Sequence, residues 1–146
     1  MITFQTERLA ACRHEMEPLF PLHYAETGEL EGGIDMAWEQ YFAMEHAGML
    51  FLLTARCDGK LVGYFLGIVM PNLHNRKRLA AVSDMYFLHP EHRGHAGIRI
   101  FREVEHAWRR MGVELATITC KVSRNYATLF ERLGWRLEEK VFIKEL

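Results

Sequence analysis

The dipeptide Asp58-Gly59 constrains the fold of this chain more than any other short stretch, because it lies between two largely apolar runs. Aspartate followed by glycine favours the tight turn that joins neighbouring antiparallel strands. The flanking runs, residues 50–57 and 61–70, have the length and composition of strands. A third run of this kind, residues 79–88, follows a polar loop. The three runs together predict an antiparallel meander.

The rest of the chain adds helices and further strands. Apolar side chains recur at helical spacing from about residue 93 to residue 111, and Gly112 follows, which is typical of a helix end. We also expect strands over 2–8, 114–122 and 135–145 (one or two strands), and helices over 13–28 (two pieces), 35–46 (capped by Asp35) and 125–133. The pattern predicts an α/β (α+β) fold, with a mixed, mostly antiparallel twisted sheet of about six to seven strands flanked by helices.

Length and composition narrow the classes of function. A chain of 146 residues, 49% of them hydrophobic, predicts one domain, residues 1–146, with a real core. The net charge of −1 gives no field to recruit nucleic acid, and we read the basic run 76–78 as a solvated loop. Three cysteines without C-x-x-C spacing favour a reducing compartment. With no long apolar run and no signal-peptide pattern, we expect a cytoplasmic protein without membrane contact.

The stretch HPEHRGHAGI, residues 89–98, places Gly94 and Gly97 where a helix is about to begin. A helix start carries unpaired N–H groups and a partial positive charge, and bare glycines let a ligand approach them. The turn therefore predicts a phosphate cradle, although glycines kept for packing would look the same. A P-loop is excluded because its Lys-Ser/Thr is missing. A dinucleotide fold is excluded because its glycine turn would follow the first strand of a repeated unit.

The segments FLHPEHRG (87–94) and LFERLGW (129–135) resemble the GCN5-related N-acetyltransferase (GNAT) family. The first matches the family's acetyl-CoA loop, R/Q-x-x-G-x-G/A, and the second matches its L-Y-E-K-L-G-F segment. The predicted order of elements also matches, so the resemblance covers most of the chain. The wording DMYFLHPEHRG…LFERLGW…FIKEL further resembles family members encoded by bacteriophages. The resemblance implies an acyl-CoA N-acyltransferase fold and acetyl-CoA as the acetyl donor.

The family pattern also implies a set of cofactor-binding positions, with some departures. The implied residues are Phe87, Leu88, Arg93, Gly94, His95, Ala96, Gly97, Ile98, Arg99, Asn125 and Phe130. Ala96 and Ile98 stand where the family prefers glycine, and Ile98 should reshape the pyrophosphate contact. A register that uses Gly94 and Gly97 as the points of close approach is the alternative. Phe130 stands where the family commonly has a tyrosine that protonates the leaving thiolate.

In this family a primary amine attacks the thioester directly in a ternary complex, so the chemistry needs a base, an oxyanion donor and an acid. We expect Asp84 to be the base, on the same side of its strand as Tyr86 and Leu88 by alternation, with a surface aspartate as the alternative. By resemblance, the oxyanion donor is a backbone N–H at a strand bulge near Leu88. Tyr126, one turn before Phe130, is the candidate acid. Tyr86, or no side-chain acid at all, remains open.

The acceptor is an amine, on a small molecule or a protein. We expect it to contact His23, Tyr24, Trp38 and His74, although aromatic residues at helical spacing often belong to a core. We expect no metal, although His89, His92 and His95 are spaced by three. Exposed strand edges would permit a homodimer. The main alternative function is a catalytically silent acetyltransferase-like module that binds a host or partner protein.

Overall fold

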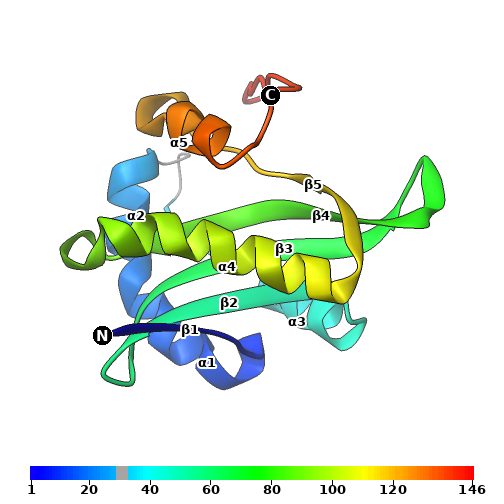
Figure 1. The fold of residues 1–146 in the computed structure, drawn as a ribbon. Helices are drawn as coiled ribbons and strands as arrows, with labels where there is room; N and C mark the ends of the chain where they lie inside the picture. Colours follow the sequence, from blue (N-terminus) through cyan, green and yellow to red (C-terminus); the bar gives the residue numbers. More distant parts are fainter. Residues whose placement is uncertain (29–32) are drawn as a thin grey trace.

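The computed structural model describes residues 1–28 and 33–146 and contains one five-stranded sheet in chain order (Figure 1). Strands β1 to β4 pair antiparallel, and β5 pairs parallel to β4. The strands are β1 (Ile2–Thr6), β2 (Leu50–Cys57), β3 (Lys60–Asn72), β4 (Asn75–Leu88) and β5 (Val113–Thr117). The helices are α1 (Leu9–Met16), α2 (Phe20–Thr27), α3 (Trp38–His46), α4 (His95–Met111) and α5 (Ala127–Arg132), with 3-10 turns η1 (Glu17–Leu19), η2 (Pro90–His92) and η3 (Val122–Arg124).

The predicted meander is confirmed as β2, β3 and β4. Asp58 and Gly59 have φ angles of 49° and 83°, so both occupy the left-handed region that a two-residue hairpin turn requires. Cys57 and Lys60 flank the turn as paired residues. The parallel pairing of β5 with β4, after α4 crosses the sheet, makes the sheet mixed as predicted.

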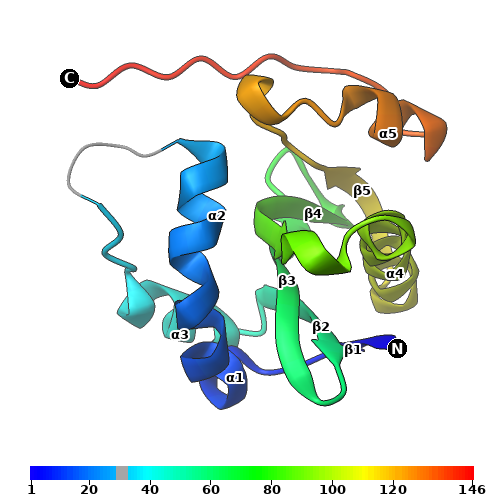
Figure 2. The same ribbon diagram turned by 90° about the vertical axis from the view of Figure 1, so that its left-hand side faces the viewer.

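Helices cover both faces of the sheet, and each face has its own core (Figure 2). α4 packs on one face because its apolar residues recur every three or four positions. Those buried on this face are Ile100, Phe101, Val104, Ala107 and Trp108. On the other face, α1, α2 and α3 pack their apolar side chains against β2, β3 and β4.

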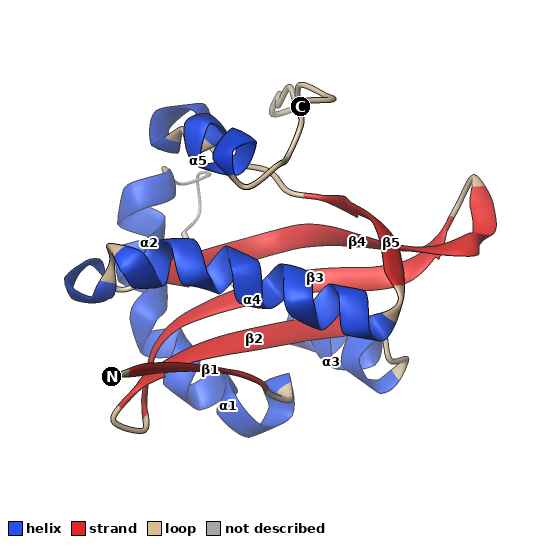
Figure 3. Ribbon diagram, viewed as in Figure 1, coloured by secondary structure: helices blue, strands red, loops and turns tan. Residues whose placement is uncertain are grey.

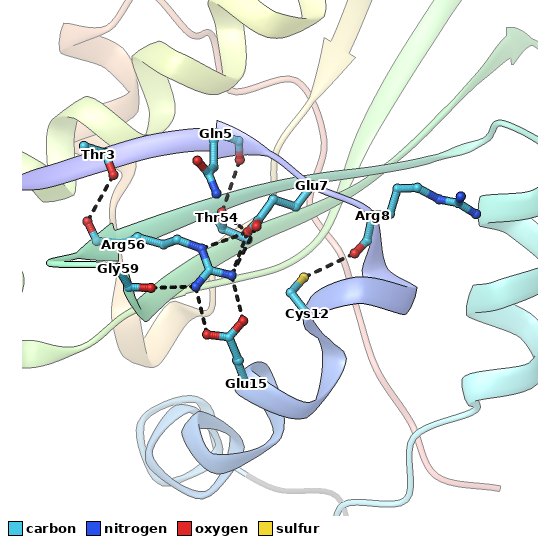
Figure 4. A network of polar contacts seen from close by, with 9 residues as sticks. All are labelled: Thr3, Gln5, Glu7, Arg8, Cys12, Glu15, Thr54, Arg56 and Gly59. Atoms are coloured by element: carbon cyan, nitrogen blue, oxygen red, sulfur yellow. Dashed lines mark hydrogen bonds and ion pairs between the residues drawn. The ribbon is translucent and has the colours of Figure 1, made fainter.

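A charged cluster around Arg56 fastens α1 to the first strands (Figure 4). The guanidinium of Arg56 donates hydrogen bonds to the carboxylates of Glu7 and Glu15 at 2.8 to 3.1 Å and to the carbonyl of Gly59 at 2.8 Å. The side chain of Arg56 is only 13% exposed. The Arg56 hydrogen bonds lower the pKa of Glu15, and the two carboxylates raise the pKa of Arg56. We call Glu7, Glu15 and Arg56 the Arg56 cluster.

The bounds of several elements differ from the sequence predictions. The sheet has five strands instead of six or seven, because residues 135–146 form no strand and are drawn as loop in Figure 3. The helix expected from Asp35 begins at Trp38, with Ala37 as its N-cap residue. The strand expected over 114–122 ends at Thr117.

Within residues 1–28 and 33–146, no helix combines the length and hydropathy needed to cross a bilayer.

Candidate active site

β4 and β5 separate partway along their length and leave an opening at one end of the sheet. Their parallel pairing runs from Leu79 opposite Val113 to Val82 opposite Thr117, where β5 ends. β4 continues to Leu88. The backbone of β4 beyond Val82 is therefore an edge that faces the opening, and an extended ligand could pair with it.

Two hydrogen bonds hold the base of this opening. The Ser83 hydroxyl accepts from the backbone N–H of Thr119 at 3.0 Å, and the Tyr86 hydroxyl donates to the Thr119 carbonyl at 2.6 Å. Burial raises the pKa of Tyr86, so this phenol keeps its proton at neutral pH. These two side chains of β4 thus connect it with Thr119, just after β5, where the pairing of the two strands stops.

A β-bulge lies at Asp84, instead of near Leu88. Met85 pairs with Leu66 and Ser83 pairs with Gly67, so Asp84 is the extra residue. The predicted sharing of one face by Asp84 and Tyr86 is wrong, because the extra residue breaks strict alternation. The carboxylate of Asp84 accepts a hydrogen bond from the Tyr41 hydroxyl of α3 at 2.6 Å, on the face of α1 to α3.

On the opposite face, Tyr86 stacks on Phe65 at 5.6 Å and packs edge-on against Phe101 of α4 at 5.2 Å. The exposed carboxylate of Asp84 and the phenol of Tyr86 therefore lie on the two sides of β4 beside the opening.

The glycine turn opens onto solvent at the start of α4. Gly94 is the N-cap residue, with a φ of 91° that favours glycine. Gly97 has no such φ, and a Cβ built there would meet no atom of the described chain within 4 Å. Neither backbone conformation nor packing within those residues explains a glycine in the first helical turn, where glycine costs about 1 kcal/mol relative to alanine. A close-approaching ligand does explain it.

The other residues of the predicted cradle surround this turn. His95 and Arg99 are exposed, and Ile98 is half-buried. Ala96 is buried and packs with Leu88 in a small cluster between β2, β3 and α4. No side chain among the described residues caps the helix start, so the partial positive charge of α4 faces the solvent there.

An ion-pair cluster joins the two walls of the opening. The guanidinium of Arg93 donates to both carboxylate oxygens of Glu26 at 2.5 and 2.7 Å, and Arg124 pairs with Glu26 at 2.9 Å. Arg93 also donates to the carbonyl of Leu88 at 2.9 Å and lies over the ring of buried Phe87. Glu26 on α2 therefore connects the end of β4 with η3, which follows β5. We call Glu26, Arg93 and Arg124 the Glu26 cluster; it has two guanidinium groups and one carboxylate.

His23 is buried beside the Glu26 cluster. It is 7% exposed, stacks on Phe87 at 5.2 Å, and its Nδ1 lies 2.7 Å from the Tyr64 hydroxyl. Burial lowers the pKa of His23 to about 4, while Glu26 opposes the shift and Arg93 adds to it. Burial raises the pKa of Tyr64. At neutral pH the pair is therefore an uncharged imidazole hydrogen-bonded to a protonated phenol.

The other predicted acceptor contacts are not gathered at one place. Tyr24 is half-buried beside His23. Trp38 packs between Phe20 and Phe42. His74 is exposed in the β3–β4 turn, at the far end of the sheet from the start of α4 (Figure 1). The structure brings together His23 and Tyr24 but leaves Trp38 in a core and His74 at a distant tip.

The segment around α5 places an aromatic pair above the opening. The side-chain oxygen of Asn125 accepts a hydrogen bond from the N–H of Ala127 at 2.9 Å, in the turn that leads into α5. Half-buried Tyr126 lies 6.4 Å from the ring of Tyr86 and 6.3 Å from that of Phe130. Phe130 is 7% exposed and packs edge-on against Phe101 in the core.

Three potential metal ligands gather on η2. Side-chain atoms of His89, Glu91 and His92 lie within 4.8 Å of one another, and His95 is not part of this group. Glu91 is 80% exposed, and exposed groups of this kind are common in proteins without a bound ion. His89, Glu91 and His92 help to line a groove of about 680 Å³ between η1, the β2–β3 turn and η2. The absence of a metal stays a prediction.

Sequence reasoning missed Glu26, Arg124, Tyr41 and Tyr64. Each has its partner 41 to 98 residues away in the chain, where no spacing or motif connects them. The acidic Glu26, three residues after His23 on α2, was the only signal, and it is too common to be informative.

The sequence of this chain matches the model of a known protein family. The model of the acetyltransferase (GNAT) family matches residues 9–135. No curated protein sequence matches the chain significantly.

Solved acetyltransferases share the fold at low sequence identity. An aminoglycoside acetyltransferase from an uncultured soil metagenomic sample, in complex with sisomicin, has a TM-score of 0.75 at 13% identity, covering 99% of this chain and 95% of its own. A ribosomal-protein-alanine N-acetyltransferase from Brucella melitensis biovar Abortus 2308 scores 0.73 at 16%, covering 100% and 99%. A predicted acetyltransferase with acetyl-CoA from Clostridium acetobutylicum scores 0.73 at 9%, covering 99% and 96%.

The family match spans most of the chain and includes the glycine turn, the opening between β4 and β5, and α5. The chain therefore belongs to the GNAT family of acetyltransferases, enzymes that use acetyl-CoA.

Proposed function

We propose that this protein transfers an acetyl group from acetyl-CoA to a primary amine by direct attack within a ternary complex. The observation that carries the proposal is Gly97, a helical glycine that neither strain nor packing among the described residues requires. It lies at the same end of the sheet as the opening between β4 and β5. A long ligand could therefore run along the edge of β4 and place its phosphates at the start of α4.

The proposed cofactor contacts follow this path. The backbone of Phe87 and Leu88 pairs with the extended arm of the ligand, since β4 has no β5 partner there. The N–H groups of residues 94–98 receive the pyrophosphate. Arg93 and Arg99 supply positive charge nearby, and Asn125 and Phe130 support the far wall from α5.

In the proposed reaction the amine nitrogen bonds to the acetyl carbonyl carbon, and the carbon–sulfur bond then breaks to release the thiolate. Asp84 accepts the proton that the amine loses; its exposed carboxylate sits at the bulge beside the opening. Tyr126 donates a proton to the leaving sulfur, and Tyr86 is the rival donor. Phe130 cannot serve, because its ring has no proton to give and is buried against Phe101.

The acceptor is an amine on a small molecule or on a protein, as aminoglycosides and ribosomal-protein alanine are for the proteins of similar fold named above. His23 and Tyr24 are the proposed contacts on the α2 side, next to the Glu26 cluster. Because the His23 imidazole is neutral and the Tyr64 phenol is protonated, this pair adds no charge to the α2 side of the opening.

Calorimetric titration with acetyl-CoA, and in parallel with CoA, tests the binding step. Saturable micromolar binding is expected. Binding of neither ligand would remove the proposal, and the second candidate would then apply: a catalytically silent module that binds a partner protein. The core position of Phe130, in place of the family's tyrosine, is the observation that favours this second candidate.

Variants at Asp84, Tyr126 and Tyr86 test the chemistry. Asp84→Asn should lower kcat and flatten its pH profile, whereas Asp35→Asn, an exposed aspartate outside the opening, should change neither. Tyr126→Phe should slow transfer more than Tyr86→Phe. An unchanged pH profile in Asp84→Asn would remove this residue from the mechanism, and the reverse order of the two tyrosines would move the acid role to Tyr86.

A further inference from the structure

The net charge of −1 hides an uneven distribution of charge along the chain. Residues 1–58 contain ten acidic residues and three lysines or arginines, whereas residues 59–146 contain nine acidic residues and fifteen lysines or arginines. The first part includes α1, α2 and α3, and the second includes α4, which covers the opposite face of the sheet (Figure 2). The small net charge of the whole chain is therefore no guide to the charge of either face.

The outer side of α4 carries mainly basic side chains. Its exposed positions recur every three or four residues, so they share one side of the helix. Between residues 95 and 110 these positions are His95, Arg99, Arg102, His106, Arg109 and Arg110. The two acidic residues of the helix, Glu103 and Glu105, are half-buried, and Glu105 already pairs with Arg109 at 3.4 Å. Positive charge therefore predominates along the exposed side of α4.

The β3–β4 turn adds a second basic group at the end of α4. The run Arg-Lys-Arg at residues 76–78 is exposed. Leu79 pairs with Val113, directly after the C-cap residue of α4, and the Arg78 guanidinium lies 3.5 Å from the Glu114 carbonyl. Figure 1 shows this turn projecting from the sheet at the end where α4 finishes. The fold thus joins two basic groups that are distant in the sequence; we call the exposed side of α4 together with residues 76–78 the α4 basic face.

The α4 basic face lacks the apolar anchors of a protein interface. None of its exposed residues from His95 to Arg110 is a large apolar one, and Met111 and Leu73 are exposed only at its end. Protein interfaces place aromatic or aliphatic side chains at their centre, whereas interfaces with nucleic acid are polar and strongly positive. The face also exposes no Phe, Tyr or Trp on which the bases of a single strand would stack. Its chemistry therefore suits the phosphate backbone of a duplex.

The length of the α4 basic face also fits a duplex. The 17 residues of α4 extend about 25 Å at the rise of an α-helix. Over this length one strand of a duplex presents about seven phosphates, spaced by about 3.4 Å along the axis. We propose that the α4 basic face binds double-stranded nucleic acid through its phosphates, without reading the base sequence. The inference gives a function to residues 76–78, which the sequence alone placed in a solvated loop, and it does not depend on acetyl transfer.

Fluorescence anisotropy with a labelled duplex of about 20 base pairs tests the binding, with DNA and RNA duplexes in parallel. Micromolar affinity is expected at low salt. It should fall steeply as the salt concentration rises, with a slope of about −4 in a plot of log K against log salt, since about five phosphates are neutralised. If neither duplex binds at low salt, the inference is wrong. A labelled polyglutamate peptide that binds more tightly than both duplexes would assign the face to an acidic protein segment and would equally overturn the inference.

Charge-reversal variants test where the duplex binds. Arg102→Glu combined with Arg110→Glu, and separately Arg76→Glu combined with Lys77→Glu, should each weaken duplex binding at least about tenfold and reduce the salt slope by about two. Acetyl-CoA affinity should stay unchanged in both double variants, because these residues lie beyond the first turn of α4. Loss of duplex binding and failure of the proposed function are therefore measured separately. Native affinity for the duplex in both variants would contradict the inference.

Arg8→Glu combined with Arg13→Glu is the matched control. Arg8 is the N-cap residue of α1 and Arg13 lies within α1, and their side chains are 79% and 41% exposed. The variant makes the same change in net charge on the other face of the sheet, so duplex binding should weaken less than about twofold. Circular dichroism and thermal unfolding check that all variants are folded. A loss as large as in the α4 variants would mean that net charge, and not the α4 basic face, controls binding.

Discussion

The Arg56 cluster and the Glu26 cluster use the same chemistry in opposite proportions. In the first, one guanidinium stands between two carboxylates; in the second, one carboxylate stands between two guanidinium groups. Arg56 is 13% exposed, whereas Arg93 and Arg124 are 31% and 38% exposed. The first cluster fastens α1 to β1 and β2. The second bridges the walls of the opening, beside the positive end of α4.

The difference shows which cluster already has all its hydrogen-bond partners within the chain. Around Arg56 every donor direction meets an acceptor within the chain, and the excess charge is negative. Around Glu26 the excess is positive, and Arg93 directly precedes Gly94, the N-cap residue of α4, where a pyrophosphate is proposed to bind. An ion pair with surplus positive charge beside a helix start suits an anionic ligand, which would replace part of the contact with Glu26. The Arg56 cluster, with its negative excess, is not suited to bind an anionic ligand.

The largest effect expected is on stability, from Arg56→Met. The variant leaves two carboxylates near one another without their shared cation, which should lower the free energy of unfolding by about 3 kcal/mol. Its affinity for acetyl-CoA should not change. Arg8→Met is the control, because Arg8 is 79% exposed and pairs at 3.9 Å, so less than about 0.5 kcal/mol is expected. Urea unfolding measures both free energies. Equal losses in the two variants would mean that the Arg56 cluster does not hold α1 against β1 and β2.

Gly97→Glu should reduce acetyl-CoA affinity at least about 100-fold, because it places a carboxylate where the phosphates are proposed to lie. Folding should be retained, since a Cβ there meets no atom of the described chain. Gly97→Ala sharpens the test: it should raise stability by about 0.5 to 1 kcal/mol, as expected for alanine in a helix, and still weaken binding. Calorimetry and thermal unfolding measure the two effects. Unchanged affinity in both variants would place the cradle elsewhere.

The two regions should also differ in their response to pH. His23 has its pKa lowered to about 4 from 6.5, so between these values the unfolded chain binds more protons than the folded one. Stability should therefore fall as the pH drops from about 6.5 to 4, by about 3 kcal/mol, since each pKa unit is worth about 1.4 kcal/mol. Arg56 lowers the pKa of Glu15, so protonation of Glu15 should lower the free energy of unfolding only below about pH 4.5.

His23→Gln keeps a partner for the Tyr64 hydroxyl but does not titrate. Urea unfolding measured from pH 7 to pH 4 should therefore give a flatter curve for His23→Gln than for the native protein. Parallel curves would show that the acid sensitivity has another source.

The sequence predicted the meander and α4 because both depend on neighbours in the chain. Asp58 and Gly59 set the hairpin through their own backbone conformation, and the stripe of α4 is a local period. Gly94 and Gly97 likewise marked the candidate cradle, since a bare helix start is a local feature. The order of elements predicted from these local patterns then matched that of the family.

The remaining differences depend on partners distant in the chain. The bulge at Asp84 appears only when β3 and β4 are set in register, and it moves Asp84 to the face opposite Tyr86. Glu26 meets Arg93 across 67 residues. The pattern of residues 135–145 is strand-like, yet a strand exists only where another strand pairs with it, and alternation alone does not name that partner.

A smaller effect, about tenfold, is expected on acetyl-CoA affinity in Arg124→Met. The variant removes one of the two guanidinium groups of the Glu26 cluster and cancels its positive excess, while α2 keeps its link to Arg93. Stability should change little, because the guanidinium of Arg124 is 38% exposed. Calorimetry checks the affinity. A loss as large in Arg56→Met would mean that general charge, and not the position of Arg124, controls binding.

The smallest effect should have the opposite sign. In the free protein, Glu26 holds both guanidinium groups, so an incoming phosphate must compete with its carboxylate. Glu26→Gln keeps the size and a hydrogen-bonding oxygen but removes the charge, and acetyl-CoA should then bind about threefold tighter, a gain of roughly 0.6 kcal/mol. Glu15→Gln makes the same change in the Arg56 cluster and should leave affinity unaltered. If Glu26→Gln binds more weakly, the carboxylate orients Arg93 and Arg124 for the ligand instead of competing with it. The two clusters would then both be positioning devices that differ only in where they act.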